Sequence, residues 1–182
     1  MTWILLALAA GLLFWGMFAF NRLVRLRNQM RTAWADIDVQ LSRRHDLVPQ
    51  LVAAVQGYAG HERAALEAVT ELRNRAIGLD SPTRLGEVES ELERALGRLF
   101  ALREAYPDLK AGGNFAQLQR DLVDVEDQLQ YARRFYNGAV RDYNDGIGRV
   151  PDLFIARAFG FPGGEFFQAD RGARGAVEVV LP

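Results

Sequence analysis

The chain has 182 residues, which leaves room for one folded domain and a short additional segment. It is 25% charged and 49% hydrophobic, a balance typical of a folded protein rather than a disordered one. Twenty-two basic residues against 23 acidic ones leave no excess of positive charge, which disfavours a nucleic-acid partner. The absence of cysteine excludes disulfides, thiolate nucleophiles and sulfur-ligated metals.

An apolar segment without a charged residue extends from Trp3 to Phe20. As a helix it is about 27 Å long, close to the roughly 30 Å thickness of the hydrocarbon layer of a bilayer. A cleaved signal peptide is the competing interpretation, but no basic residue precedes the segment, which is longer than the usual apolar region of a signal peptide. We therefore expect residues 1–21 to form an uncleaved transmembrane anchor, with Trp3 and Trp15 facing lipid.

Four arginines follow the anchor closely, namely Arg22, Arg25, Arg27 and Arg31. Because positively charged flanks stay on the cytoplasmic side, they predict a single-pass protein of the inner membrane with its N-terminus outside. The same arginines could contact anionic lipid, although setting the topology is the simpler role. Ala7 and Gly11 form a pair of small residues that could let two such helices pack closely, which by itself is a weak signal.

The region after the anchor has a helical pattern of apolar residues. No proline or glycine occurs between Met17 and Val48, so the anchor is predicted to continue as one unbroken helix, with a kink at Pro49. The apolar face continues to Ala76, which predicts either one bent helix or two abutting ones. A third helix is predicted to begin at Pro82 with Ser81 as its N-cap.

The clearest pattern in the sequence is a seven-residue repeat in the last long helix. Its core positions are Phe115, Leu118, Leu122, Val125, Leu129, Ala132, Tyr136, Ala139 and Tyr143. We expect a loop over residues 108–113 before this helix, and a capping box formed by Asn114 and Gln117 at its start. The core series becomes small toward Gly146, which predicts that another backbone approaches closely there, with tyrosine hydroxyls reaching partners at the rim.

After Pro151 the pattern predicts a short amphipathic helix over residues 153–159 and then an irregular tail. Residues 177–181 have β character, with disorder as an equal alternative. The predicted fold is all-α: a transmembrane helix continuous with a long antiparallel bundle of three to four long helices. The predicted domains are the anchor at 1–21, a cytoplasmic bundle at 22–160 and a tail at 161–182.

No constellation of polar residues favours catalysis, a cofactor or a metal. His61 and Glu62 open like a helical zinc-protease motif, but Ala65 stands where the second histidine is required. Asp36 and Asp38 are two positions apart on a helix and point away from each other, which argues against a pair of catalytic carboxylates. We expect no enzymatic activity.

Two polar clusters are candidates for contacts with a partner or between copies of the chain. The first comprises Arg43, Arg44, His45 and Asp46, for which interhelical salt bridges or partner contacts are favoured over a ligand site. The second comprises Tyr136, Asn137, Tyr143 and Asn144, in which each Tyr-Asn pair lies one heptad from the other. Buried, the second cluster would fix the register of the helices; exposed, it would form a docking strip.

The sequence resembles the LemA family of bacterial membrane-anchored proteins over residues 20–169. The motifs that carry the resemblance are NRLVRLRN at 21–28, AWADIDVQL at 33–41, RRHDLVP at 43–49, GYAGHE at 57–62, YPDLK at 106–110, AR at 132–133, and YN at 136–137 and 143–144. The resemblance implies a cytoplasmic helical bundle behind an outward-facing N-terminus, without recognised enzymatic activity. It also implies contexts that include HtpX-type membrane proteases, envelope proteins and magnetosome formation, but it supplies no catalytic residues.

From these observations we expect a structural protein that self-associates through its long helices while anchored in membrane lipid. The alternative is an adaptor that binds another membrane protein, such as an HtpX-type protease.

Overall fold

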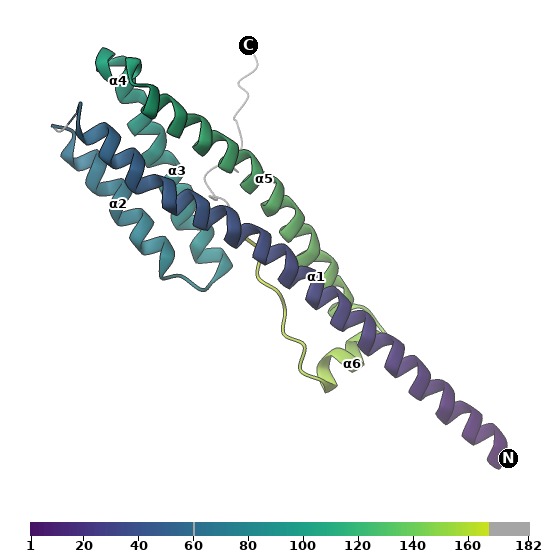
Figure 1. Cartoon of the computed structure of the whole chain (residues 1–182). Helices are drawn as coiled ribbons and strands as arrows, with labels where there is room; N and C mark the ends of the chain where they lie inside the picture. Colours follow the sequence, from purple (N-terminus) through teal and green to yellow (C-terminus); the bar gives the residue numbers. More distant parts are fainter. Residues whose placement is uncertain (60, 168–182) are drawn as a thin grey trace, which may run out of the picture. The chain divides into compact units, whose positions relative to one another are not determined.

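The computed structural model describes residues 1–59 and 61–167, and within these ranges the chain is all-α, as predicted. Its elements are α1 (Thr2–Gln56), α2 (Arg63–Ile77), α3 (Pro82–Ala101), a 3-10 turn η1 (Leu102–Glu104), α4 (Pro107–Ala111), α5 (Gly113–Gly148) and α6 (Asp152–Ala158) (Figure 1). The predicted short helix near residue 153 is therefore confirmed as α6. Residues 177–181, for which β character was predicted, lie outside the described ranges.

The chain divides into two compact units, and α1 and α5 are long enough to take part in both. Unit 1 comprises residues 1–38 and 131–165, and unit 2 comprises residues 39–130 with 166–167 among the described residues. The two units are defined by which residues pack together, so their boundaries differ from those of the predicted anchor, bundle and tail. The division into anchor, bundle and tail stays a prediction. Each unit is described by itself below.

Unit 2 is an antiparallel bundle of four helical segments: the end of α1, then α2, α3 and the first part of α5 (Figure 1). Short connections between successive helices produce this up-and-down arrangement. The core is built from aliphatic side chains of all four segments, including Leu51, Val55, Leu66, Val69, Leu92, Leu99, Leu122 and Leu129. Burial of each large apolar side chain contributes about 1.5–3 kcal/mol.

The seven-residue repeat of α5 is confirmed, because its large core positions are buried from Phe115 to Tyr143. α1 approaches Gly146 closely in unit 1, but through a leucine side chain rather than through the predicted backbone. A Cβ atom added there would lie 2.8 Å from Leu26 Cδ1 of α1. The core of unit 1 around this contact is formed by Leu23, Tyr143, Ala156 and Phe161.

The segment before α5 differs from the prediction. Residues 107–111 form the short helix α4, with Pro107 in its first turn, where the missing N–H of proline costs nothing. α5 begins at Gly113, so Asn114 lies inside the helix and the predicted capping box is wrong. The Gln117 side chain instead donates to Asp121 Oδ1, at 2.9 Å. At the start of α3, Ser81 and Pro82 take the predicted N-cap and first helical positions.

α1 continues through Pro49, where a kink was predicted, and its last residue is Gln56. Proline has no N–H, so the carbonyl of His45, four residues earlier, loses its helical partner. Arg73 of α2 takes that place, because its Nε donates to the His45 carbonyl oxygen at 2.7 Å. Gly57 follows the end of α1, and α2 is a separate helix, so the structure has the second of the two predicted alternatives.

The Arg73 contact predicts a measurable coupling with Pro49. We expect Arg73→Met to lower the free energy of unfolding by about 1–3 kcal/mol, because it leaves a buried carbonyl without a donor. In the Pro49→Ala background the helix supplies the missing N–H, so the same substitution should cost much less. Thermal and urea unfolding of the four variants, followed by circular dichroism in detergent, measures the coupling. An equal loss of unfolding free energy in both backgrounds would contradict this role, because the effect of Arg73 would then not depend on the N–H that Pro49 lacks.

Candidate functional site

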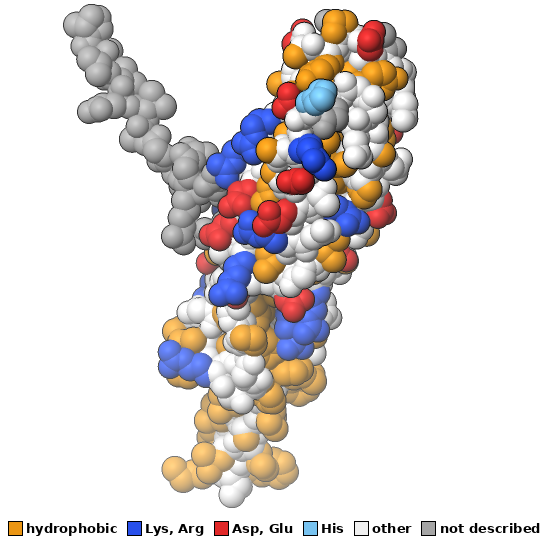
Figure 2. Space-filling view, turned by 90° about the vertical axis from the view of Figure 1, so that its left-hand side faces the viewer, with side chains coloured by type: hydrophobic (Ala, Val, Ile, Leu, Met, Phe, Trp, Pro, Cys, Tyr) orange, Lys and Arg blue, Asp and Glu red, His pale blue; other side chains and the backbone are white. Residues whose placement is uncertain are grey.

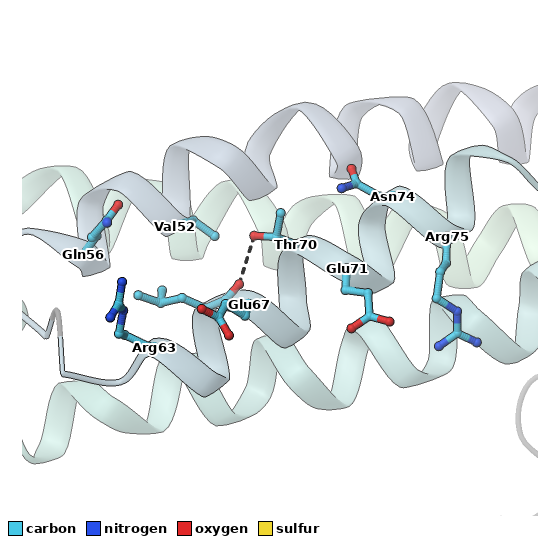
Figure 3. Close-up of a pocket in the computed structure, with 9 residues that line it drawn as sticks. Val52, Gln56, Arg63, Glu67, Thr70, Glu71, Asn74 and Arg75 are labelled. Atoms are coloured by element: carbon cyan, nitrogen blue, oxygen red, sulfur yellow. Dashed lines mark hydrogen bonds between the residues drawn. The ribbon is translucent and has the colours of Figure 1, made fainter.

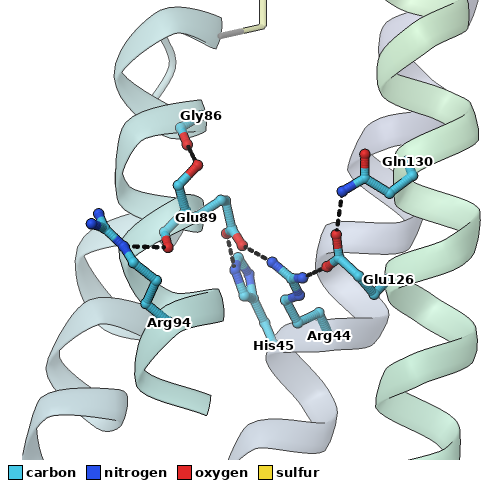
Figure 4. Close-up of polar contacts among 8 residues, drawn as sticks. Arg44, His45, Gly86, Glu89, Arg94, Glu126 and Gln130 are labelled. Carbon is cyan, nitrogen blue, oxygen red and sulfur yellow. Dashed lines mark hydrogen bonds and ion pairs between the residues drawn. The ribbon is translucent and has the colours of Figure 1, made fainter. Parts of the chain in front are cut away.

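A buried ionic network connects three helices of unit 2 (Figure 4). Arg44 and His45 of α1 both reach Glu89 of α3: Arg44 Nη1 lies 3.0 Å from Glu89 Oε2, and His45 Nε2 lies 2.6 Å from Glu89 Oε1. Arg44 also forms an ion pair with Glu126 of α5. Glu126 in turn accepts a hydrogen bond from Gln130 Nε2, at 2.7 Å.

The Glu89 carboxylate is ionised although its side chain is 0% exposed. Burial by itself would raise the pKa of this carboxyl group, since a charge loses its hydration in the protein interior. The hydrogen bond from His45 and the positive charge of Arg44 outweigh that effect, and the pKa of Glu89 lies below its ordinary value of 4.5. The network is thus an internally compensated charge cluster that holds α3 against α1.

The first predicted cluster is therefore divided by the packing of α1. Arg44 and His45 point into unit 2 and form the interhelical salt bridges that were one of its two expected roles. Arg43 and Asp46, on either side of them, are exposed on the surface of α1. Only these two remain accessible to a partner, and their role in partner binding stays a prediction.

Glu89 and Arg73 were not among the residues singled out from the sequence. Glu89 lies on the apolar face of α3, between Leu85 and Leu92, and a charge on such a face is a signal that could have identified it. No comparable signal exists for Arg73, because its partner is a backbone carbonyl on another helix.

A surface groove lies between the end of α1 and α2, with a volume of about 710 Å³ (Figure 3). Val52 and Gln56 line it from α1, whereas α2 contributes charged residues of both signs at four-residue spacing: Arg63, Glu67, Glu71 and Arg75. Between them the Thr70 hydroxyl donates to the carbonyl of Leu66, at 2.9 Å. This mixture of two positive and two negative charges is typical of a solvated helix face and favours neither an anion nor a cation.

In unit 1 the second predicted cluster binds a nearby segment of the same chain. Tyr143 donates its hydroxyl to the Pro162 carbonyl at 2.7 Å, and Tyr136 donates to the Glu165 carbonyl at 2.8 Å. The side chain of Asn144 bonds to both backbone groups of one residue: its Nδ2 donates to the Gly164 carbonyl at 3.0 Å, and its Oδ1 accepts from the Gly164 N–H at 2.8 Å. We call residues 161–165 the strap. The strap has no regular secondary structure, so α5 side chains satisfy its backbone groups.

At position 164 the strap passes so close to the helices that a side chain larger than that of glycine would require Met30 to move. A Cβ atom there would lie 2.6 Å from Met30 Sδ and 3.4 Å from Val140 Cγ1. Phe161, at the start of the strap, is buried in the core of unit 1, with the Arg27 guanidinium 4.9 Å from the centre of its ring. The strap is therefore an integral part of the unit rather than a loose tail.

The tyrosines that hold the strap are buried rather than exposed, and their hydroxyls bond to the strap, whereas the role predicted for buried tyrosines was to fix the register of the helices. Burial, together with the negative charge of Glu165, raises the pKa of Tyr136 to about 12. Burial also raises the pKa of Tyr143, although Arg27 and Arg31 act in the opposite direction. Asn137 is half-buried beside Tyr136. Both tyrosine hydroxyls stay protonated donors at neutral pH.

The residues predicted to face lipid or to set the topology all belong to unit 1. Trp3 is exposed, and Trp15 is partly covered. Arg25 and Arg31 are exposed, whereas Arg22 forms an ion pair with Asp152 of α6, with 2.9 Å between Nη1 and Oδ2. Arg22 and Arg27 thus have structural contacts within the unit in addition to their predicted roles.

The buried network predicts that Glu89→Gln destabilises unit 2. Removal of the negative charge leaves the buried positive charge of Arg44 with Glu126 as its remaining ion-pair partner in this network. This should lower the free energy of unfolding by about 3 kcal/mol. Urea unfolding at neutral pH, followed by circular dichroism, measures the loss. Because the folded pKa of Glu89 is lowered, its contribution is complete above about pH 4.5 and is lost as the pH falls further. The wild type should therefore lose part of its advantage over Glu89→Gln in acid.

The matched control is Glu91→Gln, two residues away on the same helix. Glu91 pairs with Arg75 at 3.4 Å, but both side chains are about half exposed, so the substitution should cost less than about 1 kcal/mol. Equal losses for the two variants would contradict the role given to the buried network.

The strap predicts a contrast between two adjacent glycines. Gly164→Ala should loosen residues 161–165, because its methyl group has to displace Met30. Gly163→Ala should have little effect, since its Cβ would make an ordinary contact, 3.7 Å from Asn144 Oδ1. Hydrogen exchange of the backbone amide at position 164, measured by mass spectrometry, should accelerate in the first variant only. Unchanged exchange in both would show that the strap tolerates a side chain.

Comparison with known proteins assigns the chain to a family. The sequence profile of the LemA family matches residues 33–180. Among curated proteins, the magnetosome protein MamQ 2 of Paramagnetospirillum magneticum is 22% identical over 90% of this chain and 69% of its own length. Magnetosome protein MamQ of Magnetospirillum gryphiswaldense matches with the same identity and coverage. Protein LemA of Metamycoplasma hominis is 27% identical over 70% of this chain and 58% of its own length. The profile covers most of the chain, which therefore belongs to the LemA family.

Proposed function

We propose that the protein is a membrane-anchored scaffold that self-assembles through its long helices at the cytoplasmic face of the inner membrane. The observation that carries this proposal is the N-terminal part of α1. Large apolar side chains are exposed there around the helix, among them Ile4, Leu5, Leu6, Leu8, Leu12, Leu13 and Phe14. Among the described helices, α1 alone is long and apolar enough to cross a membrane. Lipid is the solvent in which such a surface is stable.

The arginines that follow the apolar segment support the proposed orientation. Arg25 and Arg31 are exposed close to the end of that segment, where positive charge favours the cytoplasmic side. With this orientation the N-terminus lies outside and unit 2 lies in the cytoplasm.

Exposed aromatic residues on α5 support self-association. Tyr131 and Phe135 lie one helical turn apart on the surface of unit 1, and the guanidinium of Arg134 lies 4.7 Å from the centre of the Tyr131 ring. Aromatic and arginine side chains are enriched in protein interfaces relative to the rest of the surface. We propose that a second copy covers this aromatic pair. A scaffold of this kind carries out no reaction, so the role we assign to the buried Glu89 network is to stabilise the fold.

An adaptor that binds another membrane protein, such as an HtpX-type protease, is the second candidate. It is favoured by the exposed Arg43 and Asp46, which the rigid Arg44 and His45 contacts hold in fixed positions on α1. Crosslinking in native membranes separates the two functions: a scaffold is captured mainly with itself, and an adaptor with one different protein in fixed stoichiometry.

The deciding measurement for the scaffold is the mass of the full-length protein in detergent, from light scattering with the detergent contribution subtracted. We expect a multiple of the 20.4 kDa chain at micromolar concentration. Phe135→Glu should shift this mass toward the monomer, because loss of a central aromatic contact costs about 2 kcal/mol, roughly thirty-fold in affinity.

Arg141→Glu is the matched control, since Arg141 is exposed on the same helix and the substitution also adds negative charge. It should leave the mass unchanged. A strict monomer for the wild type would refute the scaffold, and an equal effect of both substitutions would refute the assigned interface.

A further inference from the structure

α6 packs against α1 at the end of the apolar segment. The Ile155 Cδ1 atom of α6 lies 3.8 Å from the position of a Cβ on Gly16. The ring of Phe20 has edge-to-face contacts with two rings that follow Ile155, with centroid distances of 5.0 Å to Phe159 and 5.7 Å to Phe161. Gly16 precedes Phe20 by one helical turn, about 6 Å along the axis. α6 therefore meets α1 inside the apolar segment, not beyond it.

The outer face of α6 and its flanks is apolar and exposed. Val150 is 66% exposed, Phe154 is 63% exposed and Phe159 is 62% exposed. Met17 and Phe18 of α1, at the same level, are also exposed. Figure 2 shows how apolar side chains cover the N-terminal end of α1, with basic side chains next to this surface. A protein surface in water rarely presents aromatic side chains in this density.

Positive charge borders this apolar face. Arg149 precedes α6 and Arg157 lies in its last turn, and both are exposed. The acidic residue of the helix, Asp152, is buried and paired with Arg22 at 2.9 Å, so it does not offset these arginines at the surface. Exposed aromatic side chains bordered by arginine are the pattern of a helix that lies in the surface layer of an anionic membrane.

We propose that α6 is a second membrane contact, which docks on the anionic lipid surface of the leaflet from which α1 emerges. Phe154 and Phe159 enter the layer between headgroups and acyl chains, and Arg149 and Arg157 bind lipid phosphates. The occupant is lipid because α6 is fixed against the part of α1 that itself crosses the bilayer. This inference rests on the proposed anchor, and it adds a contact that fixes how deeply the anchor sits in the membrane.

The test uses the full-length chain in nanodiscs that contain phosphatidylcholine and phosphatidylglycerol. Because the chain has no cysteine, Phe154→Cys, Arg141→Cys and Leu13→Cys each give one site for a nitroxide label. Accessibility of the label to oxygen, which concentrates in lipid, is compared with accessibility to a water-soluble nickel chelate. We expect the oxygen-to-nickel ratio at position 154 to be several-fold higher than at position 141, which is an exposed position of α5 in the same unit and outside the proposed self-association interface.

Position 13 tests the anchor separately, since it lies in the apolar segment. A high ratio at 13 with a low ratio at 154 would overturn the docking of α6 and leave the anchor intact. A low ratio at 13 would overturn the anchor itself. Poor access of both reagents to position 154 would show that a protein surface, such as a second copy, covers α6, and would also overturn the inference. Circular dichroism of each labelled variant confirms that the fold is retained.

Discussion

The packing of unit 2 depends on one buried carboxylate. Glu89 loses its hydration in the interior, and that cost is recovered only if donors reach both of its oxygens. Arg44 and His45 are adjacent in sequence, so their side chains leave α1 in different directions, and Glu89 has to lie between them. This requirement fixes the rotation of α1 against α3. The ion pair of Arg44 with Glu126 extends the same constraint to α5.

Side chains also replace regular backbone hydrogen bonds at two places. In unit 2 the Arg73 guanidinium supplies the donor that Pro49 removes from α1, which lets the helix continue. In unit 1 Asn144 offers a donor and an acceptor to Gly164, as a neighbouring β-strand would. A backbone that departs from regular structure is thus kept in place by polar side chains of the long helices, whose own geometry is regular and fixed.

The long helices and the family could be predicted from the sequence because their signals are local: apolar periodicity, breaks at glycine and proline, and short motifs. Arg44 and Tyr143 could be identified as important for the same reason. Their partners could not, because Glu89 and the strap are brought to them only by the register of other helices. The helix α4 was missed since five residues carry too little periodicity, and the Arg73 contact at Pro49 was missed since a side-chain donor from another helix cannot be anticipated locally.

His45 takes part in two contacts at once, through its ring with Glu89 and through its carbonyl with Arg73. A displacement of α1 along its own axis by one helical turn, about 5.4 Å, would break both of them together with the Arg44 ion pairs. A piston-like stroke of this helix would therefore cost the bundle all of these contacts at once.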